Sequence, residues 1–145
     1  MNVAEYFKVV SVNDRVIHLE HKGFWSDEVA EKIADSIMLD FRRAAIEASS
    51  EGPFIMLADL RRIGVLSRKG RIAVSRLMSC AKEYNMYKSI EIIPHAITRL
   101  SLREAAELSD VNNFRVMTES LEEALDIVET LKQEMAETEE SVATT

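Results

Sequence analysis

The feature that most constrains the fold is an uninterrupted apolar run, Phe54 to Ala58, which ends at Asp59 and precedes a helical pattern from Ser67. Such a run predicts a strand buried on both faces, as in a sheet covered by helices. The segment between Asp59 and Ser67 is expected to be a loop that leaves the strand at its carboxyl end. Open α/β sheets usually place their binding sites there, so this loop is the first candidate for function.

Strand and helix patterns alternate along the rest of the chain. Two strands, at 6–12 and 16–24, are expected to form an antiparallel hairpin that turns at Asn13-Asp14. Ser26 is a predicted N-cap for a long amphipathic helix that ends before Gly52. The later expected elements are a helix after the Ser67 N-cap, a strand at 90–93 extended by 95–97, a short helix at 102–108, a strand at 114–117 and a helix opened by a capping box at 120–123.

The faces and ends of these elements follow from the same patterns. Pro94 is expected to place its strand at a sheet edge or in a bulge. Residues 134–145 are acidic and non-periodic, so a frayed or disordered tail is expected after a single domain at 1–133. Two helices are expected to bury one stripe each: Ile72, Leu77, Cys80, Ala81 and Tyr84 in the first, and Leu121, Ala124, Leu125, Val128 and Leu131 in the last. The order β-β-α-β-α-β-α-β-α predicts an α/β fold whose sheet is mixed because it starts with a hairpin.

Composition excludes several classes. A chain of 145 residues suits one domain, and its net charge of −7 argues against nucleic-acid binding. The single cysteine, Cys80, excludes an internal disulfide and favours a reducing, cytoplasmic compartment. The N-terminus lacks the pattern of a signal peptide, and no apolar run approaches the ~20 residues that span a membrane.

The acidic chain carries one basic stretch. Between Leu60 and Lys82 there are seven basic residues and no Asp or Glu. The loop at 59–71, which contains most of these basic residues, is the candidate binding surface for an anion or a partner, because exposed helix N–H groups and basic side chains attract anions. The alternative is a solvated basic face whose charges pair with acids elsewhere. The candidate residues are Asp59, Arg61, Arg62, Ser67, Arg68, Lys69, Gly70 and Arg71.

Individual residues in this stretch have structural readings too. Asp59 could hold the loop through an Asx turn or accept a proton, and the first role is the more common. Ser67 is most simply an N-cap, with phosphorylation as the alternative. The stretch has no Gly-x-x-x-x-Gly-Lys-[Ser/Thr] pattern, so it is not a P-loop.

Other candidates are few. Phe24 and Trp25 could form a hydrophobic staple or a lid, or line an apolar ligand pocket. His18 and His21 are oddly spaced on a strand, point to opposite faces and are poorly placed to share a metal. No nucleophile motif is present, and Cys80 is expected to pack rather than react. We therefore expect no enzyme activity, cofactor or metal.

Three segments carry a resemblance to a known family. They read GFWSDEVAEKIADSI, FIMLADLRRIGVLSRKG and FRVMTESLEEALDIVETL. Together with the initial hairpin, they resemble a STAS-type domain, and most closely the SpoIIAA-like branch of bacterial anti-sigma-factor antagonists. The resemblance extends to about Leu131. It implies a mixed sheet of about five strands with helices mainly on one side, and a non-enzymatic role in protein recognition or ligand sensing.

The resemblance also implies a phosphorylation motif that this sequence lacks. In regulatory members, an aspartate ends the strand and Asp-Ser-[Ser/Thr]-Gly opens the following helix, where the residue before the glycine is phosphorylated. Asp59 matches the strand-end aspartate and Gly70 matches the glycine. Lys69 stands at the phosphorylated position, and Ser67 and Arg68 replace the two residues before it. The same segment has become basic.

Two hypotheses result from this reading. The first is a non-enzymatic STAS-like module that binds a protein partner or a small anionic ligand through residues 59–71. The second is a carrier or sensor of an apolar, lipid-like ligand held between helices and sheet. Short edge strands and one-sided helix layers leave apolar surface that a homodimer could cover.

Overall fold

The computed structural model describes residues 2–93 and 96–143. Its sheet has five strands in the order β1-β2-β3-β4-β5. The β1–β2 pair is antiparallel and the other three pairs are parallel, so the predicted mixed sheet is confirmed. The elements in chain order are η1 (Val3–Glu5), β1 (Phe7–Asn13), β2 (Val16–Trp25), α1 (Asp27–Ala48), β3 (Phe54–Leu66), α2 (Arg68–Glu83), β4 (Met86–Ile92), α3 (Ala96–Ser109), η2 (Asn112–Phe114), β5 (Arg115–Thr118) and α4 (Leu121–Ala143).

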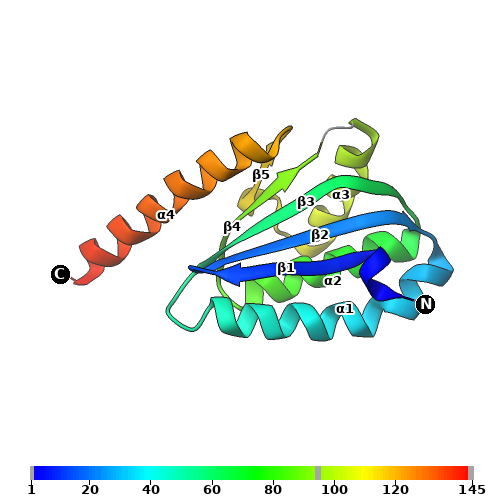
Figure 1. Cartoon of the computed structure of the whole chain (residues 1–145), viewed down its shortest axis with the longest axis horizontal. Helices are drawn as coiled ribbons and strands as arrows, with labels where there is room; N and C mark the ends of the chain where they lie inside the picture. Colours follow the sequence, from blue (N-terminus) through cyan, green and yellow to red (C-terminus); the bar gives the residue numbers. More distant parts are fainter. Residues whose placement is uncertain (1, 94–95, 144–145) are drawn as a thin grey trace.

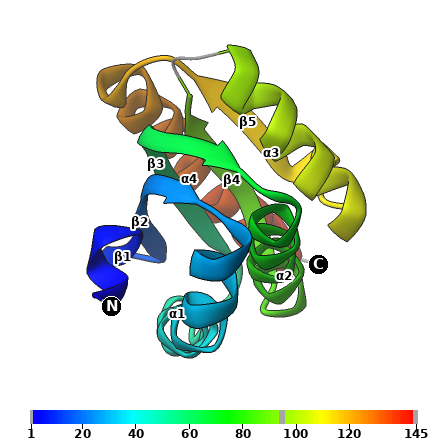
Figure 2. The same cartoon turned by 90° about the vertical axis from the view of Figure 1, so that its right-hand side faces the viewer.

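The layers follow from the connections. Each parallel connection moves one strand further along the sheet, and right-handed crossovers in one direction place their helices on the same face. Accordingly α1, α2 and α3 cover one face, as Figures 1 and 2 show. The α4 helix follows the last strand and packs on the opposite face against β3, β4 and β5. The expectation that helices lie mainly on one side is confirmed.

The hairpin turns one residue later than predicted. Asn13 still pairs with Val16, and the two central residues are Asp14 and Arg15, with φ angles of 51° and 64°. Positive φ at both central positions is the geometry of a type I′ turn, whose twist suits a two-residue hairpin. The turn is held from the far end of the chain, because Lys132 Nζ lies 2.8 Å from a carboxylate oxygen of Asp14.

The β3 strand corrects the central sequence prediction. Residues 60–66 are strand rather than loop, because β2 continues alongside and Trp25 still pairs with Leu66. Backbone pairing sustains a strand whatever its side chains, so Arg61 and Arg62 interrupt the apolar pattern without ending it. Pairing with β4 stops at Asp59, where Ile92 is its partner. The last seven residues of β3 therefore form, with the end of β2, a two-stranded ribbon beyond β4.

Three further predictions differ from the structure. The β4 strand is internal, since it pairs with both β3 and β5, so the expected edge position is wrong. Ala96 begins α3, so the expected strand extension over 95–97 is wrong from this residue on; Pro94 and His95 lie outside the described residues. The chain stays helical to Ala143, and Met135 within the expected frayed tail is buried.

Two apolar side chains face solvent instead of the core. Ile72 and Leu125 are exposed, although both belong to predicted buried stripes. The first turns of α2 bury Gly70, Ala73 and Val74, and Ile72 lies outside this buried side. A Cβ on Gly70 would lie 3.0 Å from the backbone oxygen of Trp25, so this glycine lets the helix start close to β2.

Candidate functional site

Asp59 and Arg61 form an ion pair at the base of the ribbon. The Asp59 carboxylate accepts hydrogen bonds from Arg61 N–H at 3.1 Å, Nε at 3.0 Å and Nη2 at 2.7 Å. These bonds favour the charged form, and the Arg61 guanidinium holds the pKa of Asp59 below its ordinary value. Asp59 thus fixes the local backbone and its neighbour, in line with the structural reading of this residue.

The start of α2 is already capped from within the chain. Ser67 Oγ accepts the Gly70 N–H at 3.0 Å, and Asp27 Oδ1 accepts the Lys69 N–H at 3.1 Å. Hydrogen bonding to Ser67 lowers the pKa of Asp27, so this carboxylate is charged at neutral pH. An acidic side chain of α1 therefore takes the place where the sequence suggested a bound anion.

Two other basic residues of the predicted surface are also neutralised internally. Lys69 forms an ion pair with Glu31 of α1. Arg71 donates to the Leu66 carbonyl at 3.1 Å, and its Nε lies 3.4 Å from Glu104 of α3. Lys69 and Arg71 thus tie α2 to its two neighbouring helices, as the alternative reading of paired charges predicted for part of the stretch.

A smaller set of residues remains outward and unpaired. Phe24 in β2 and Val65 in β3 are each 57% exposed. Arg62 in β3 and Arg68, the first residue of α2, are exposed as well. Among the residues that the structure describes, no carboxylate lies within ion-pairing distance of Arg62 or Arg68. We call these four residues the tip surface. It combines two apolar groups with two arginines at the carboxyl end of β2 and β3.

Trp25 lies inside the protein and has a structural role. Its side chain is fully buried, and Nε1 donates to the Lys22 carbonyl at 2.8 Å. Phe24, the preceding residue, is exposed to solvent. The two aromatic residues therefore do not line one pocket, as the apolar-ligand hypothesis required.

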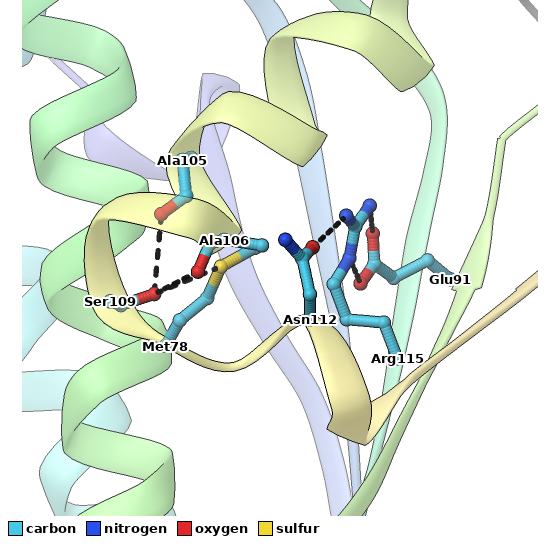
Figure 3. A network of polar contacts seen from close by, with 7 residues as sticks. All are labelled: Met78, Glu91, Ala105, Ala106, Ser109, Asn112 and Arg115. Carbon is cyan, nitrogen blue, oxygen red and sulfur yellow. Dashed lines mark hydrogen bonds and ion pairs between the residues drawn. The ribbon is translucent and has the colours of Figure 1, made fainter.

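The sequence reading missed a buried ion pair on the helix-covered face. Arg115 of β5 meets Glu91 of β4 through two bonds, at 2.6 Å from Nε and 2.8 Å from Nη2 (Figure 3). A third bond, 3.2 Å long, runs from Arg115 Nη1 to the Asn112 side chain. The side chains of Glu91 and Arg115 are only 2% and 5% exposed. The available signal was an acidic residue inside an apolar strand, which requires a buried cationic partner.

A cavity lies beside this pair, between the sheet and the helices. Its volume is about 20 Å³, and Glu91, Ser89 and His21 are the polar residues in its lining. Burial lowers the pKa of His21 to about 4, so its imidazole is neutral at pH 7. The neighbouring His18 lies on the opposite face, as the odd spacing predicted.

The described residues offer little for covalent or metal chemistry. No cluster of three His, Cys, Asp or Glu side chains within them could hold a metal ion. Cys80 is buried, and burial raises the pKa of its thiol, which lowers its reactivity. Within the same part of the chain, no helix is long and apolar enough to cross a membrane.

Comparison with known proteins identifies the fold. No family model matches the sequence, and no curated protein matches it. Among solved structures, the chain is similar to the Bacillus cell fate determinant SpoIIAA in its phosphorylated form. The TM-score is 0.53 at 15% sequence identity, and the match covers 84% of this chain and 98% of that one. The protein therefore has the SpoIIAA-like STAS fold that its sequence resembles.

Proposed function

We propose that this chain is a non-enzymatic STAS-like regulatory module that binds a protein partner through the tip surface, within and beside residues 59–71. The observation that carries the proposal is a set of exposed side chains near the carboxyl ends of β2 and β3 and the start of α2. They are Phe24 and Val65, with Arg62 and Arg68, neither of which lies within ion-pairing distance of a described carboxylate. Interfaces use aromatic and arginine side chains as their main energetic anchors. The likeness to SpoIIAA supports the class of module through the fold alone.

A protein partner is better supported here than a small anion. Two backbone N–H groups at the start of α2, those of Lys69 and Gly70, already bond to Asp27 and Ser67. A free anion would compete with the Asp27 carboxylate at this end of the helix. A protein that brings both an apolar side chain and acidic residues would use the exposed groups without displacing anything.

The lipid-like carrier is less well supported. The cavity between helices and sheet measures about 20 Å³, the space of about one water molecule. A lipid chain would have to displace much of the packed core around Phe41, Leu77 and Leu102. Phe24 and Trp25 do not contribute to the lining of this cavity.

The test compares affinity capture by three immobilised proteins. The first is the wild type, and the second carries Phe24→Ser, Arg62→Ala and Arg68→Ala. The third, a matched control, carries Arg43→Ala and Arg103→Ala, which remove two exposed arginines from α1 and α3. Proteins from the native cells that bind the wild type and the control should be lost from the tip variant, and their binding should weaken with salt.

Folding of each variant is checked by circular dichroism and thermal denaturation. Equal capture of the same proteins by a folded tip variant would contradict the proposal. Loss of capture in the control variant would point to a general effect of positive charge rather than to the tip surface. Arg61 and Lys69 stay unchanged in these variants because they pair with Asp59 and Glu31.

A further inference from the structure

The outer edge of the sheet, at β1, is open and partly apolar. Among the described residues β1 pairs only with β2, so the backbone groups on its other edge are free to pair. Val10 is 44% exposed, and Val9 and Val12 pack against the margin of the core while staying partly accessible. Figure 2 shows this edge with α1 next to it. An edge strand with free backbone groups is a template for pairing with another strand.

The charges beside this edge are balanced and have no partner within the chain. A groove between β1 and α1 is lined by Lys8 of β1 and by Asp40, Arg43 and Glu47 of α1. All four are exposed, and none of them forms an ion pair with another described residue. The groove thus carries as many basic as acidic groups, although the whole chain has a net charge of −7. Two copies that repel each other overall can therefore meet at this edge without repulsion.

The α1 charges also have the order that a two-fold symmetric contact requires. Residues 40, 43 and 47 are spaced by three and four, so they form one stripe along the helix. In a contact about a two-fold axis, the same stripe of the second copy runs in the opposite direction. When the axis passes between Asp40 and Arg43, Asp40 of each copy faces Arg43 of the other. The same attractive pair then forms twice.

We infer that this edge joins two copies of the chain, through antiparallel pairing of β1 with β1 and contact of α1 with α1. The bulge between Val9 and Ser11 would lie at the axis, so that residues 7–9 of one copy pair with residues 11–13 of the other. The spacing suits both layers, because α1 contacts both β1 and β2. The two α1 helices would then lie two strand spacings apart, about 10 Å, which is the distance between packed helices.

The inference is independent of the tip surface, because none of the tip residues lines the groove. Antiparallel pairing of β1 places the two tip surfaces at opposite ends of the dimer, where each can meet a partner. Capture through the tip surface therefore does not require the dimer, and Arg43→Ala keeps its use as a charge control in that experiment.

Sedimentation velocity of the purified full chain measures the dimer and its dissociation constant. The wild type should sediment as a dimer that dissociates on dilution. Asp40→Arg should raise the dissociation constant at least about 10-fold, because its repulsion with Arg43 occurs twice, and Arg43→Asp should do the same. The double variant Asp40→Arg with Arg43→Asp exchanges the two charges and should return the constant to within about 3-fold of the wild type.

Two further variants separate the interface from general effects of charge. Asp35→Arg makes the same charge change at an exposed residue of α1 that lines the opposite groove, beside α2, and should not weaken the dimer. Val10→Asp places two carboxylates near the axis and should raise the dissociation constant at least about 10-fold. Circular dichroism and thermal denaturation check that each variant is folded.

A wild type that sediments as a single chain at every concentration would overturn the inference. A dimer that survives both Asp40→Arg and Val10→Asp would also overturn it, because another surface must then join the copies. A charge-exchanged double variant that dimerises as weakly as Asp40→Arg would contradict the reciprocal pairing of Asp40 with Arg43, on which the inference rests.

Discussion

Two arginine–carboxylate pairs lie at the same level of the sheet, on opposite faces. Asp59 of β3 pairs with Ile92 of β4, and the preceding residue, Ala58, pairs with Glu91. Because side chains alternate along a strand, Glu91 faces the helices α1 to α3 and Asp59 faces the other side. Asp59 binds Arg61 on its own strand, and Glu91 binds Arg115 across the sheet.

The two pairs differ mainly in their access to water. The carboxylates are both buried, with side chains 9% exposed in Asp59 and 2% in Glu91, but the arginine side chain is 45% exposed in the Asp59–Arg61 pair and 5% exposed in the Glu91–Arg115 pair. An exposed pair contributes little because water and salt screen it. A buried pair adds little net stability itself, but the loss of one partner leaves a charge without compensation. Similar geometry therefore predicts different responses to mutation.

The largest effect is expected from Arg115→Ala. This change leaves the Glu91 carboxylate buried without its guanidinium, and should lower the free energy of unfolding by about 3–5 kcal/mol. Urea denaturation is measured for this variant and for Arg61→Ala, the matched change in the pair whose arginine is in contact with water. The double variant Glu91→Gln with Arg115→Met should recover much of the loss, because no charge stays buried. If Arg115→Ala and Arg61→Ala lowered the free energy of unfolding equally, the two pairs would not differ in the way proposed.

The second largest effect is a loss of stability in acid, caused by His21 on the helix-covered face. Burial lowers the pKa of His21 to about 4 in the folded protein, whereas an unfolded histidine titrates near 6.5. The unfolded chain therefore binds more protons between these values, and stability falls as the pH drops from about 6.5 to about 4. The full loss amounts to about 3 kcal/mol.

The measurement is urea denaturation at a series of pH values between 7 and 4. His21→Gln cannot titrate and should show a smaller fall in unfolding free energy than the wild type over this range. His18→Gln, on the opposite face, is the matched control for removing a histidine from the same strand. A fall in His21→Gln as large as in the wild type would assign the acid sensitivity to other groups.

The two pairs also differ in how far apart their residues lie in the chain, and this difference decides what the sequence could predict. Features that depend on neighbours in the chain were predicted well: Ser26 and Ser67 are N-caps, and Ser120 accepts the Glu123 N–H at 3.1 Å. Asp59, two residues from Arg61, belongs to this local kind, and its holding role followed from its position. The order of strands and helices rests on periodicity and was confirmed.

Features that depend on partners distant in the chain were missed. The pair of Glu91 and Arg115 spans 24 residues and requires the β4–β5 register, which periodicity does not provide. The continuation of β3 to Leu66 depends on β2 as its partner, so a pattern read from one strand ended it at Asp59. The tip surface could not be predicted either, because the sequence does not show that Arg61, Lys69 and Arg71 have internal partners.

The smallest effect is expected at the exposed pair, and it sharpens the comparison from the other side. Asp59→Asn keeps an oxygen that can accept the Arg61 N–H but removes the charge, so the unfolding free energy should fall by less than about 1 kcal/mol at neutral pH.

The pKa of Asp59 is lowered in the folded state by Arg61, so the stabilisation by this ion pair is present at neutral pH. It is lost as the pH falls below the ordinary value of about 4 towards the folded-state pKa. Added salt should reduce it further, since the guanidinium is in contact with water. Thermal denaturation in low and high salt measures this, and a loss as large as that of Arg115→Ala would mean that water does not screen the Asp59–Arg61 pair.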